Sequence, residues 1–267
     1  MKEQLWELIL SVRERSPLVH NITNYVVMNN TANALLAIGA SPIMAHAAEE
    51  TDEIVSICQA TVINIGTLDQ AWIQSMLLAA QSAREKNKPW ILDPVGAGAS
   101  QLRNQTVQLL LQYKPDVIRG NASEILSLAN MTGTTKGVDS TNESTEAIQA
   151  GRLLNRTYGS TVCISGQTDI ILDSSRISYL YNGHPLMQQV TGLGCSATAV
   201  CGAFLAIEQD TYIAAVAAMA LFSLSGELAQ QHAAGPGSLQ VELLNKLYNI
   251  TEDEFFTHLK LDMHEQV

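Results

Sequence analysis

The segment from Thr61 to Ser100, TVINIGTLDQAWIQSMLLAAQSAREKNKPWILDPVGAGAS, contains two short apolar runs separated by a long amphipathic stretch. The runs TVINIG and PWILDP end in glycine, aspartate or proline, as buried strands do. Between them, residues 70–86 carry apolar side chains at spacings of three and four, which predicts a helix with one buried face. Strand, helix and strand in this order form one unit of a parallel sheet.

The same alternation continues on both sides of this segment. SPIMA precedes an amphipathic stretch at 49–59, PWILDP precedes one at 101–113, and DVIRG precedes one at 122–131. A chain that repeats this unit builds a mainly parallel sheet with helices on both faces. The fold class is therefore predicted to be α/β.

The pattern changes in the second half of the chain. The polar, turn-rich residues 133–146 predict a surface loop before a helix at 145–158. After TVCIS, the short runs DIILDS and RISYLYNG predict an antiparallel hairpin at the edge of the sheet. From Gly194 onward almost all of the sequence has a helical pattern, broken near Pro236.

Length and charge limit the possible functions. The chain has 267 residues, which suits a single domain over 1–267, and a formal net charge of −11. Nucleic acid and anionic membranes require basic patches, so neither is expected as a partner. The N-terminal segment MKEQLWELILSVRERSP predicts an amphipathic helix and not a signal peptide, and the apolar stretch at 212–226 predicts a core helix. We expect a cytoplasmic protein.

Three loops follow predicted strands, where open α/β sheets bind their ligands. They are NIGTLD at 64–69, LDPVGAGAS at 92–100 and IRGNASEI at 118–125. Asp93 and Glu124 lie in the second and third loops, where one metal–phosphate complex could reach both carboxylates. Magnesium suits such a pair, because it takes one or two protein carboxylates and phosphate oxygens while it keeps several waters.

Each of these charged positions also has a structural alternative. Asp93 could cap a turn, and Glu124 could form a capping box with Asn121 at the start of a helix. Arg119, at a strand end, could hold a phosphate with its forked guanidinium or could form a surface ion pair.

The segment GLGCSA at 192–197 places two glycines before a predicted helix start. It formally matches the dinucleotide pattern G-x-G-x-x-A, but that pattern requires a strand–helix–strand context and here only helices follow. The Walker phosphate-loop pattern is absent from the sequence. Consecutive amides at a helix N-terminus can nevertheless bind an anion, and the alternative is a tight turn that requires glycine.

Cys195 follows the second glycine, Gly194, and could be a nucleophile, a metal ligand, a general base or only a small residue. The other three cysteines, Cys58, Cys163 and Cys201, lie in apolar segments and are expected to be inert core residues. An unperturbed thiol has a pKa of about 8.5, which a helix N-terminus is expected to lower.

Six segments, in the order found here, resemble the hydroxyethylthiazole kinase family of the ribokinase-like superfamily. They are SPLVHNITNYVV, NIGTLD, ILDPVGAGAS, IRGNASEI, VTGLGC and GPGSLQVELLNKL. The resemblance implies a three-layer α/β/α fold with a mainly parallel central sheet. It also implies ATP-dependent phosphorylation, with Mg²⁺, of the primary hydroxyl of 5-(2-hydroxyethyl)-4-methylthiazole in thiamine biosynthesis and salvage. A homotrimer with thiazole sites between subunits is implied as well.

The resemblance assigns roles to individual positions. The thiazole pocket is implied at Asn24, Val26, Met44, Gly66 and Gly192. The ATP phosphates are implied at Arg119, Asn121 and Ser165, and magnesium at Asp93 and Glu124. Many ribokinase-like enzymes have an aspartate base where Cys195 stands. We therefore expect Cys195 to be a marginal base beside an anion hole, centred on Gly194, that provides most of the catalysis.

Three other functions remain open from the sequence. One is a ribokinase-like kinase that acts on a pyrimidine or a vitamin B6 alcohol. A cysteine hydrolase or acyl transferase is another, and it would need a histidine such as His184 or His232 to activate Cys195. The third is a nucleotide-binding sensor without catalysis.

Overall fold

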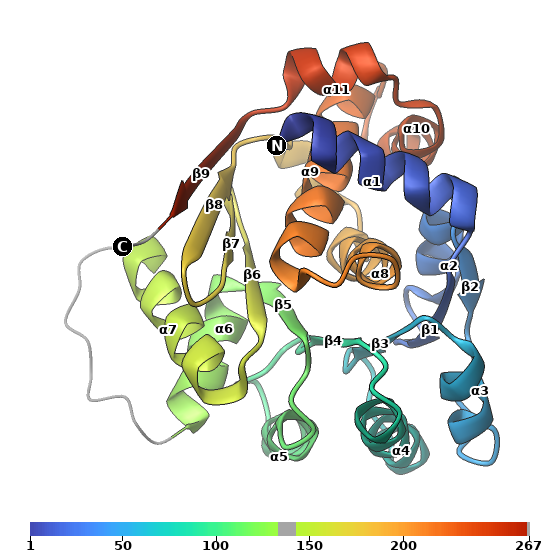
Figure 1. The fold of residues 1–267 in the computed structure, drawn as a ribbon, viewed down its shortest axis with the longest axis vertical. Coiled ribbons are helices and arrows are strands. Elements are labelled where there is room, and N and C mark those ends of the chain that lie inside the picture. The colour runs from blue at the N-terminus through green and yellow to red at the C-terminus, as the bar shows by residue number, and fades with distance from the viewer. Residues whose placement is uncertain (133–142, 266–267) are drawn as a thin grey trace.

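The computed structural model describes residues 1–132 and 143–265 and contains a nine-stranded sheet between two layers of helices (Figure 1). The strand order is β2-β1-β3-β4-β5-β6-β7-β8-β9. Strands β1 to β6 pair in parallel, and β7 to β9 continue the sheet in antiparallel pairing. The strands are β1 Leu18–Ile22, β2 Ser41–Ile43, β3 Ala60–Asn64, β4 Trp90–Asp93, β5 Val117–Asn121, β6 Thr161–Ser165, β7 Asp169–Leu172, β8 Arg176–Leu180 and β9 Leu261–Glu265.

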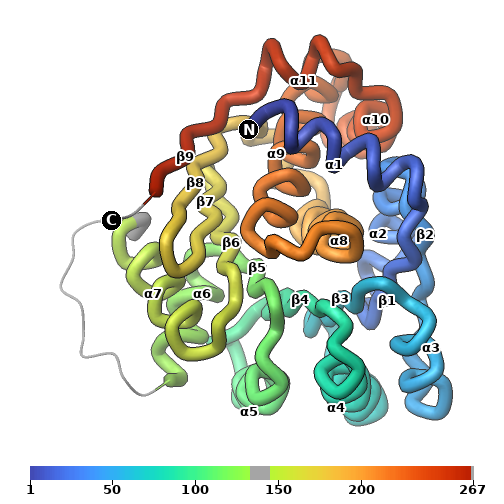
Figure 2. Tube along the Cα trace, in the orientation of Figure 1, coloured from blue at the N-terminus to red at the C-terminus, as the bar shows by residue number. Residues whose placement is uncertain are grey.

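Helices cover both faces of the sheet, as Figures 1 and 2 show. One layer contains α3 Thr51–Ile57, α4 Gln70–Glu85, α5 Gln101–Leu111, α6 Ala122–Met131 and α7 Glu143–Tyr158. The other contains α1 Lys2–Arg15, α2 Met28–Ala37, α8 Leu193–Leu205, α9 Thr211–Gln230, α10 Pro236–Asn249 and α11 Glu252–His258, with the short 3-10 helix η1 Pro185–Gln189 before α8.

Adjacent residues of the central strands enter different cores. Val62 and Ile91 belong to the cluster that includes α8 and α9, whereas their successors Ile63 and Leu92 belong to the cluster that includes α4 and α5. Successive side chains of a strand point to opposite faces, so a strand buried on both faces must be apolar throughout. This confirms the predicted three-layer α/β/α fold with a mainly parallel sheet.

Most predicted elements are present with boundaries shifted by a few residues. The helix predicted at 122–131 is α6, with the same boundaries, and the predicted hairpin is β7–β8. Of the predicted loop at 133–146, residues 133–142 lie outside the described residues and the remainder already belongs to α7.

The sequence prediction is wrong at the C-terminal end of the sheet. Nearly everything after Gly194 was expected to be helical, yet β9 pairs with β8 and forms the sheet edge that the hairpin was expected to form. Its sequence LDMHE contains three charged or titratable side chains and lacks β-branched residues. Main-chain pairing with β8 and the packing of Leu261 and Met263 against the core, and not strand propensity, therefore define this strand.

Helix α9 is the one helix within the described residues that is long and apolar enough to cross a membrane. Of its apolar window, 94% is buried inside the fold, where it packs against α1, α8 and α10. This agrees with the core helix predicted at 212–226.

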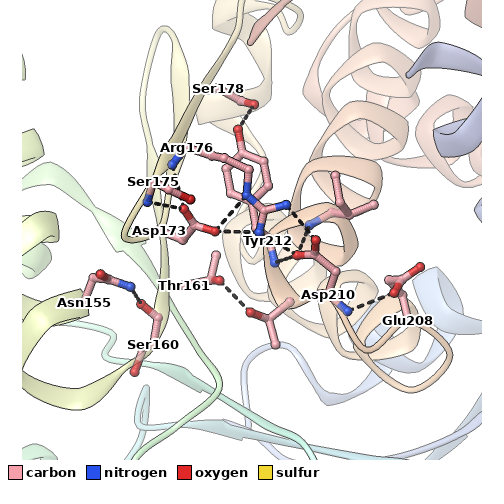
Figure 3. A network of polar contacts seen from close by, with 12 residues as sticks. Asn155, Ser160, Thr161, Asp173, Ser175, Arg176, Ser178, Glu208, Asp210 and Tyr212 are labelled. Carbon is pink, nitrogen blue, oxygen red and sulfur yellow. Dashed lines mark hydrogen bonds and ion pairs between the residues drawn. The ribbon is translucent and has the colours of Figure 1, made fainter. Parts of the chain in front are cut away.

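A guanidinium connects the antiparallel hairpin to the start of α9 (Figure 3). Arg176 donates to Asp173 Oδ2 from Nη2 at 2.6 Å and to Asp210 Oδ2 from Nη1 at 2.6 Å. Asp210 is also the N-cap of α9 and accepts the amide of Tyr212 at 3.1 Å. The Arg176 guanidinium lies 4.2 Å from the centroid of the Tyr212 ring. One side chain thus links β8, the β7–β8 turn and α9.

We expect Arg176→Met to lower the free energy of unfolding by about 2 kcal/mol, because charged hydrogen bonds are lost and two carboxylates lose their partner. Urea denaturation measures the change. Arg176→Lys is the control and should give an intermediate loss, since lysine keeps the charge but not the fork. An unchanged unfolding midpoint for Arg176→Met would contradict this role.

Candidate active site

The carboxyl ends of the parallel strands and the start of α8 meet at one edge of the sheet. Asn64, the last residue of β3, is in register with Asp93, the last residue of β4. Asn121 and Ser165, which end β5 and β6, are likewise paired. The topology therefore brings together loops that are far apart in the sequence.

A chain of buried hydrogen bonds crosses these strand ends. Asn24 Nδ2 and the Gly66 amide donate to Asn64 Oδ1 at 2.8 and 2.9 Å, and Asn64 Nδ2 donates to Asp93 Oδ2 at 2.7 Å. A β-carbon at position 66 would overlap the Asn24 amide group, so this approach requires glycine. The structure thus brings Asn24, Gly66 and Asp93 together through Asn64, which the sequence did not indicate.

Arg119 extends the same network towards α8. Its Nη1 donates to the Gly194 carbonyl at 2.9 Å and to Thr198 Oγ1 at 3.2 Å, and the Thr198 hydroxyl donates to Asp93 Oδ2 at 2.8 Å. Arg119 is only 5% exposed, so it is not the surface ion pair that the sequence left open. Its buried Nε has no hydrogen-bond partner among the described residues.

The turn before α8 requires glycine at its first position. Gly192 has φ of +81°, and a β-carbon there would lie 2.5 Å from Val27 Cγ1. The first main-chain bond of α8 runs from the Ser196 amide to the Gly192 carbonyl at 2.9 Å. The amides of residues 193–195 precede that bond at the positive end of the helix dipole, where an anion is favoured.

A cleft of about 1100 Å³ begins at this helix start. Its walls include the predicted site residues Arg119, Asn121, Ser165, Gly192 and Gly194. The walls also include Tyr181, His184, Met187, Met219 and Phe222. Residues expected to hold phosphate therefore share one cleft with a partly apolar lining.

Of the residues expected to bind the thiazole, Gly192 lines this cleft, whereas Asn24, Val26, Met44 and Gly66 are not among its lining residues. Asn24 Nδ2 lies 3.6 Å from Cys195 Sγ, and the Val26 amide donates to Asn24 Oδ1 at 3.1 Å. The Val26 side chain is 61% exposed, and Met44 is half-buried just after the edge strand β2. This part of the surface is open in a single chain.

Glu124 forms the capping box that the sequence left as an alternative. Its Oε2 accepts the Asn121 amide at 2.8 Å, and Asn121 Oδ1 accepts the Glu124 amide at 2.9 Å. Its Oε1 accepts the Gly96 amide at 2.9 Å. Each carboxylate oxygen has a further lone pair, so the capping box and a ligand are compatible.

Asp93 is a buried carboxylate held by side chains, and not the turn cap that was the alternative. The pKa of Asp93 is raised to about 6, mainly by burial; the charge of Arg119 opposes the rise and the charge of Glu124 adds to it. Two neighbouring carboxylates fit a magnesium ion that keeps most of its waters. Within the described residues no group of three or more His, Cys, Asp or Glu side chains gathers for a metal, so a cage made of protein ligands alone does not fit.

The expected lowering of the Cys195 pKa is wrong. Burial raises the pKa of the Cys195 thiol to about 11, and the charge of Asp93 adds to the effect, although hydrogen bonds from Asn64 and Asn24 and the charge of Arg119 oppose it. Desolvation therefore outweighs the helix N-terminus. Cys195 is a neutral thiol near neutral pH, which makes it a weak base and a weak nucleophile.

The two histidines considered for a cysteine hydrolase have other surroundings. His184 Nδ1 accepts the Leu186 amide at 3.1 Å, and His232 is exposed. Among the described residues neither histidine hydrogen-bonds to Cys195, so the activating contact that this alternative requires is not in place. Cys58, Cys163 and Cys201 are free and buried, as expected for core residues.

Comparison with known proteins gives one consistent result. Residues 9–253 match the model of the hydroxyethylthiazole kinase family. The chain is 54% identical to a hydroxyethylthiazole kinase from Syntrophus aciditrophicus, over 97% of both chains. It is 56% identical to one from Leptospira biflexa, over 91% of both chains.

Solved structures agree with the fold. A hydroxyethylthiazole kinase protein from Pyrococcus horikoshii superimposes with a TM-score of 0.92 at 42% identity, covering 98% of this chain and 100% of that one. A pyridoxal kinase from Staphylococcus aureus superimposes with a TM-score of 0.64 at 16% identity, covering 93% and 99%. The second similarity concerns the fold alone.

The raised pKa of Cys195 predicts slow alkylation. The rate of iodoacetamide labelling at Cys195 should rise about tenfold per pH unit from neutral to mildly alkaline pH without levelling off, because only the thiolate reacts. Peptide mass spectrometry follows the site, and Cys195→Ala is the blank. A plateau that begins near neutral pH would mean an activated thiol and would contradict the assignment.

Proposed function

The chain belongs to the hydroxyethylthiazole kinase family, and we infer that it uses ATP to phosphorylate the primary hydroxyl of 5-(2-hydroxyethyl)-4-methylthiazole in thiamine biosynthesis and salvage. One structural observation carries the proposed location of the reaction. Arg119 and the start of α8 line one cleft, and Cys195 at that helix start lies 3.6 Å from Asn24 Nδ2 in the neighbouring cluster. Anion-binding groups on one side and a place for a neutral alcohol on the other suit phosphate transfer.

The phosphate end of the site consists of donors that are already in place. Arg119, Asn121 and Ser165 would bind the ATP phosphates, and the amides around Gly194 would face the phosphate that is transferred. Phosphate transfer passes through a loose transition state with charge on the peripheral oxygens, so fixed donors lower its free energy without reorganisation. Arg119 is preorganised in this sense, because Gly194 and Thr198 already hold its Nη1.

Asp93 and Glu124 would hold Mg²⁺, which neutralises phosphate charge when bound. The capping box fixes Glu124, and the side chains of Asn64 and Thr198 fix Asp93. Both carboxylates are therefore oriented before any ligand arrives.

The alcohol end would be formed by Asn24, Val26, Met44, Gly66 and Gly192. A soft methionine surface and few carboxylates suit a neutral heterocycle better than a sugar, whose hydroxyls would each need a partner. The substrate hydroxyl would lie beside Cys195. With a pKa of about 11, the thiol contributes little as a base. Little is needed, since the loose transition state does not require prior removal of the hydroxyl proton.

An ADP-release assay with and without the thiazole alcohol tests this mechanism. We expect Cys195→Asp to keep or raise kcat, since a carboxylate is the better base, and Cys195→Ala to lose no more than about 10²-fold. Glu124→Ala should lose about 10³-fold, as removal of a group that stabilises charge does. Glu124→Gln, which can still cap α6, controls for helix stability.

If Cys195→Asp and Cys195→Ser were both inactive and a covalent intermediate formed on the sulfur, Cys195 would be a nucleophile. ADP release that is independent of the thiazole alcohol, or equal with a pyrimidine or vitamin B6 alcohol, would reject the assigned substrate.

We further propose that residues 1–267 form one cytoplasmic domain and that three copies assemble, with thiazole sites between subunits. Tyr25 and Val26 are 60% and 61% exposed beside Asn24, and Leu36 of α2 is also exposed. A neighbouring subunit over this surface would enclose the alcohol and bury apolar side chains.

The trimer predicts a mass in solution of three times 28.9 kDa. Light scattering measures the mass, and a dilution series measures the activity per chain. Activity should fall over the same concentration range in which the trimer dissociates. A monomer that is fully active would contradict a shared site.

A further inference from the structure

Asn64 is the central polar side chain of the strand-end network, and the mechanism above uses it only to hold Asp93. It is 1% exposed and ends β3, which lies between β1 and β4 in the sheet. Asn24 follows β1, and Asp93 ends β4. Asn64 is therefore the residue between the alcohol end of the site and its phosphate and magnesium end.

The hydrogen bonds of Asn64 determine which way its amide points. Oδ1 accepts from two donors, Asn24 Nδ2 at 2.8 Å and the Gly66 amide at 2.9 Å. Nδ2 donates to Asp93 Oδ2 at 2.7 Å. The flipped amide would place donors against donors and an oxygen against a carboxylate, so a single orientation is compatible with these partners.

The bond to Asp93 also selects a carboxylate oxygen. The Thr198 hydroxyl donates to the same atom, Oδ2, at 2.8 Å. Two donors on one oxygen fix the rotation of the carboxylate and leave Oδ1 to meet a cation or a substrate. Asn64 and Thr198 approach from different elements, β3 and α8, so the orientation does not depend on a single loop.

Building on the proposed function, we propose that Asn64 is a positioning residue that aligns Asn24 with Asp93, and so aligns the alcohol with the phosphate it receives. Asn64 does not need to touch either substrate for this role. A misplacement of about 1 Å in reacting groups can cost about 10²-fold in rate, which sets the scale of the expected effect.

Few other side chains could make this connection. Leucine has a similar shape but forms no hydrogen bonds. Aspartate would place a second buried carboxylate against Asp93, and serine is too short to reach from Asn24 to Asp93. The amide provides an acceptor on one side and a donor on the other, which is what the two neighbours require.

The first test is Asn64→Leu with Asn21→Leu as a matched control. Asn21 is a buried asparagine on β1 whose Nδ2 bonds only to the Val19 carbonyl among described residues. Both variants should lose stability. Only Asn64→Leu should lose about 10²-fold in kcat, while its KM for ATP stays within about threefold of wild type. Equal kcat values for the two variants would reduce Asn64 to a structural residue and overturn the proposal.

A double-mutant cycle asks whether Asn64 acts through Asp93. Thr198→Val removes the second donor to Oδ2 and should also lower kcat. Because both donors orient one carboxylate, the combined variant should lose less than the product of the two single losses. Losses that multiply would mean independent effects and would contradict the shared orientation.

A crystal structure of Asn64→Leu gives a readout that does not depend on activity. The Asp93 carboxylate and the Asn24 amide should both leave their wild-type positions by more than about 0.5 Å, the tolerance of a productive site. If both stay in place, the proposal fails whatever the kinetics show. Asn64→Ser serves for the same comparison if Asn64→Leu does not fold. Absence of thiazole-dependent ADP release in the wild type would reject the proposed function instead.

Discussion

The start of α8 is held in place by the burial of the helix that follows it, and the rest of the site depends on this constraint. From Ser196 to Leu205 every residue of α8 is buried, against β1, β3 and β4 on one side and α2 and α9 on the other. The close packing of such a core leaves the helix little freedom. The amides at its N-terminus therefore have fixed positions at the carboxyl edge of the sheet, where Gly192 turns the chain. Burying an apolar helix thus positions a polar site.

The polar groups at this edge are costly to bury, and their mutual hydrogen bonds offset the cost. Arg119 and Asp93 share Thr198, and Asp93 and Asn24 share Asn64. Among the described residues, the first amides of α8 are hydrogen-bond donors that have no main-chain acceptor. In a low-dielectric environment unused donors attract an anion strongly, and because they are already oriented they require no reorganisation when charge moves. The same burial makes Cys195 a neutral thiol, so the site favours stabilisation of charge over removal of a proton.

The sequence predicted those features that local pattern controls. The apolar runs gave the parallel strands, and Asn121 with Glu124 gave the capping box. It did not give β9, because that strand offers only two apolar side chains, Leu261 and Met263, and depends on main-chain pairing with β8. Nor could it give Asn64, since an asparagine at the end of a strand resembles any turn residue until β1 and β4 lie beside it. The pKa of Cys195 was predicted in the wrong direction for a similar reason: the helix start is visible in the sequence, and the burial around it is not. Strand ends indicated Arg119, Asp93 and Glu124, whereas the specific roles of the site residues came from the family resemblance and not from spacing.

In the proposed reaction, the amides at the start of α8 hold the negative charge that builds up while the phosphate is transferred. A crystal structure with a non-hydrolysable ATP analogue and the thiazole alcohol tests it most directly. We expect the terminal phosphate to accept hydrogen bonds from the amides of Gly194 and Cys195, with another phosphate oxygen on the Arg119 guanidinium. A triphosphate bound elsewhere in the cleft, with these amides bonded to water or to protein, would contradict the account.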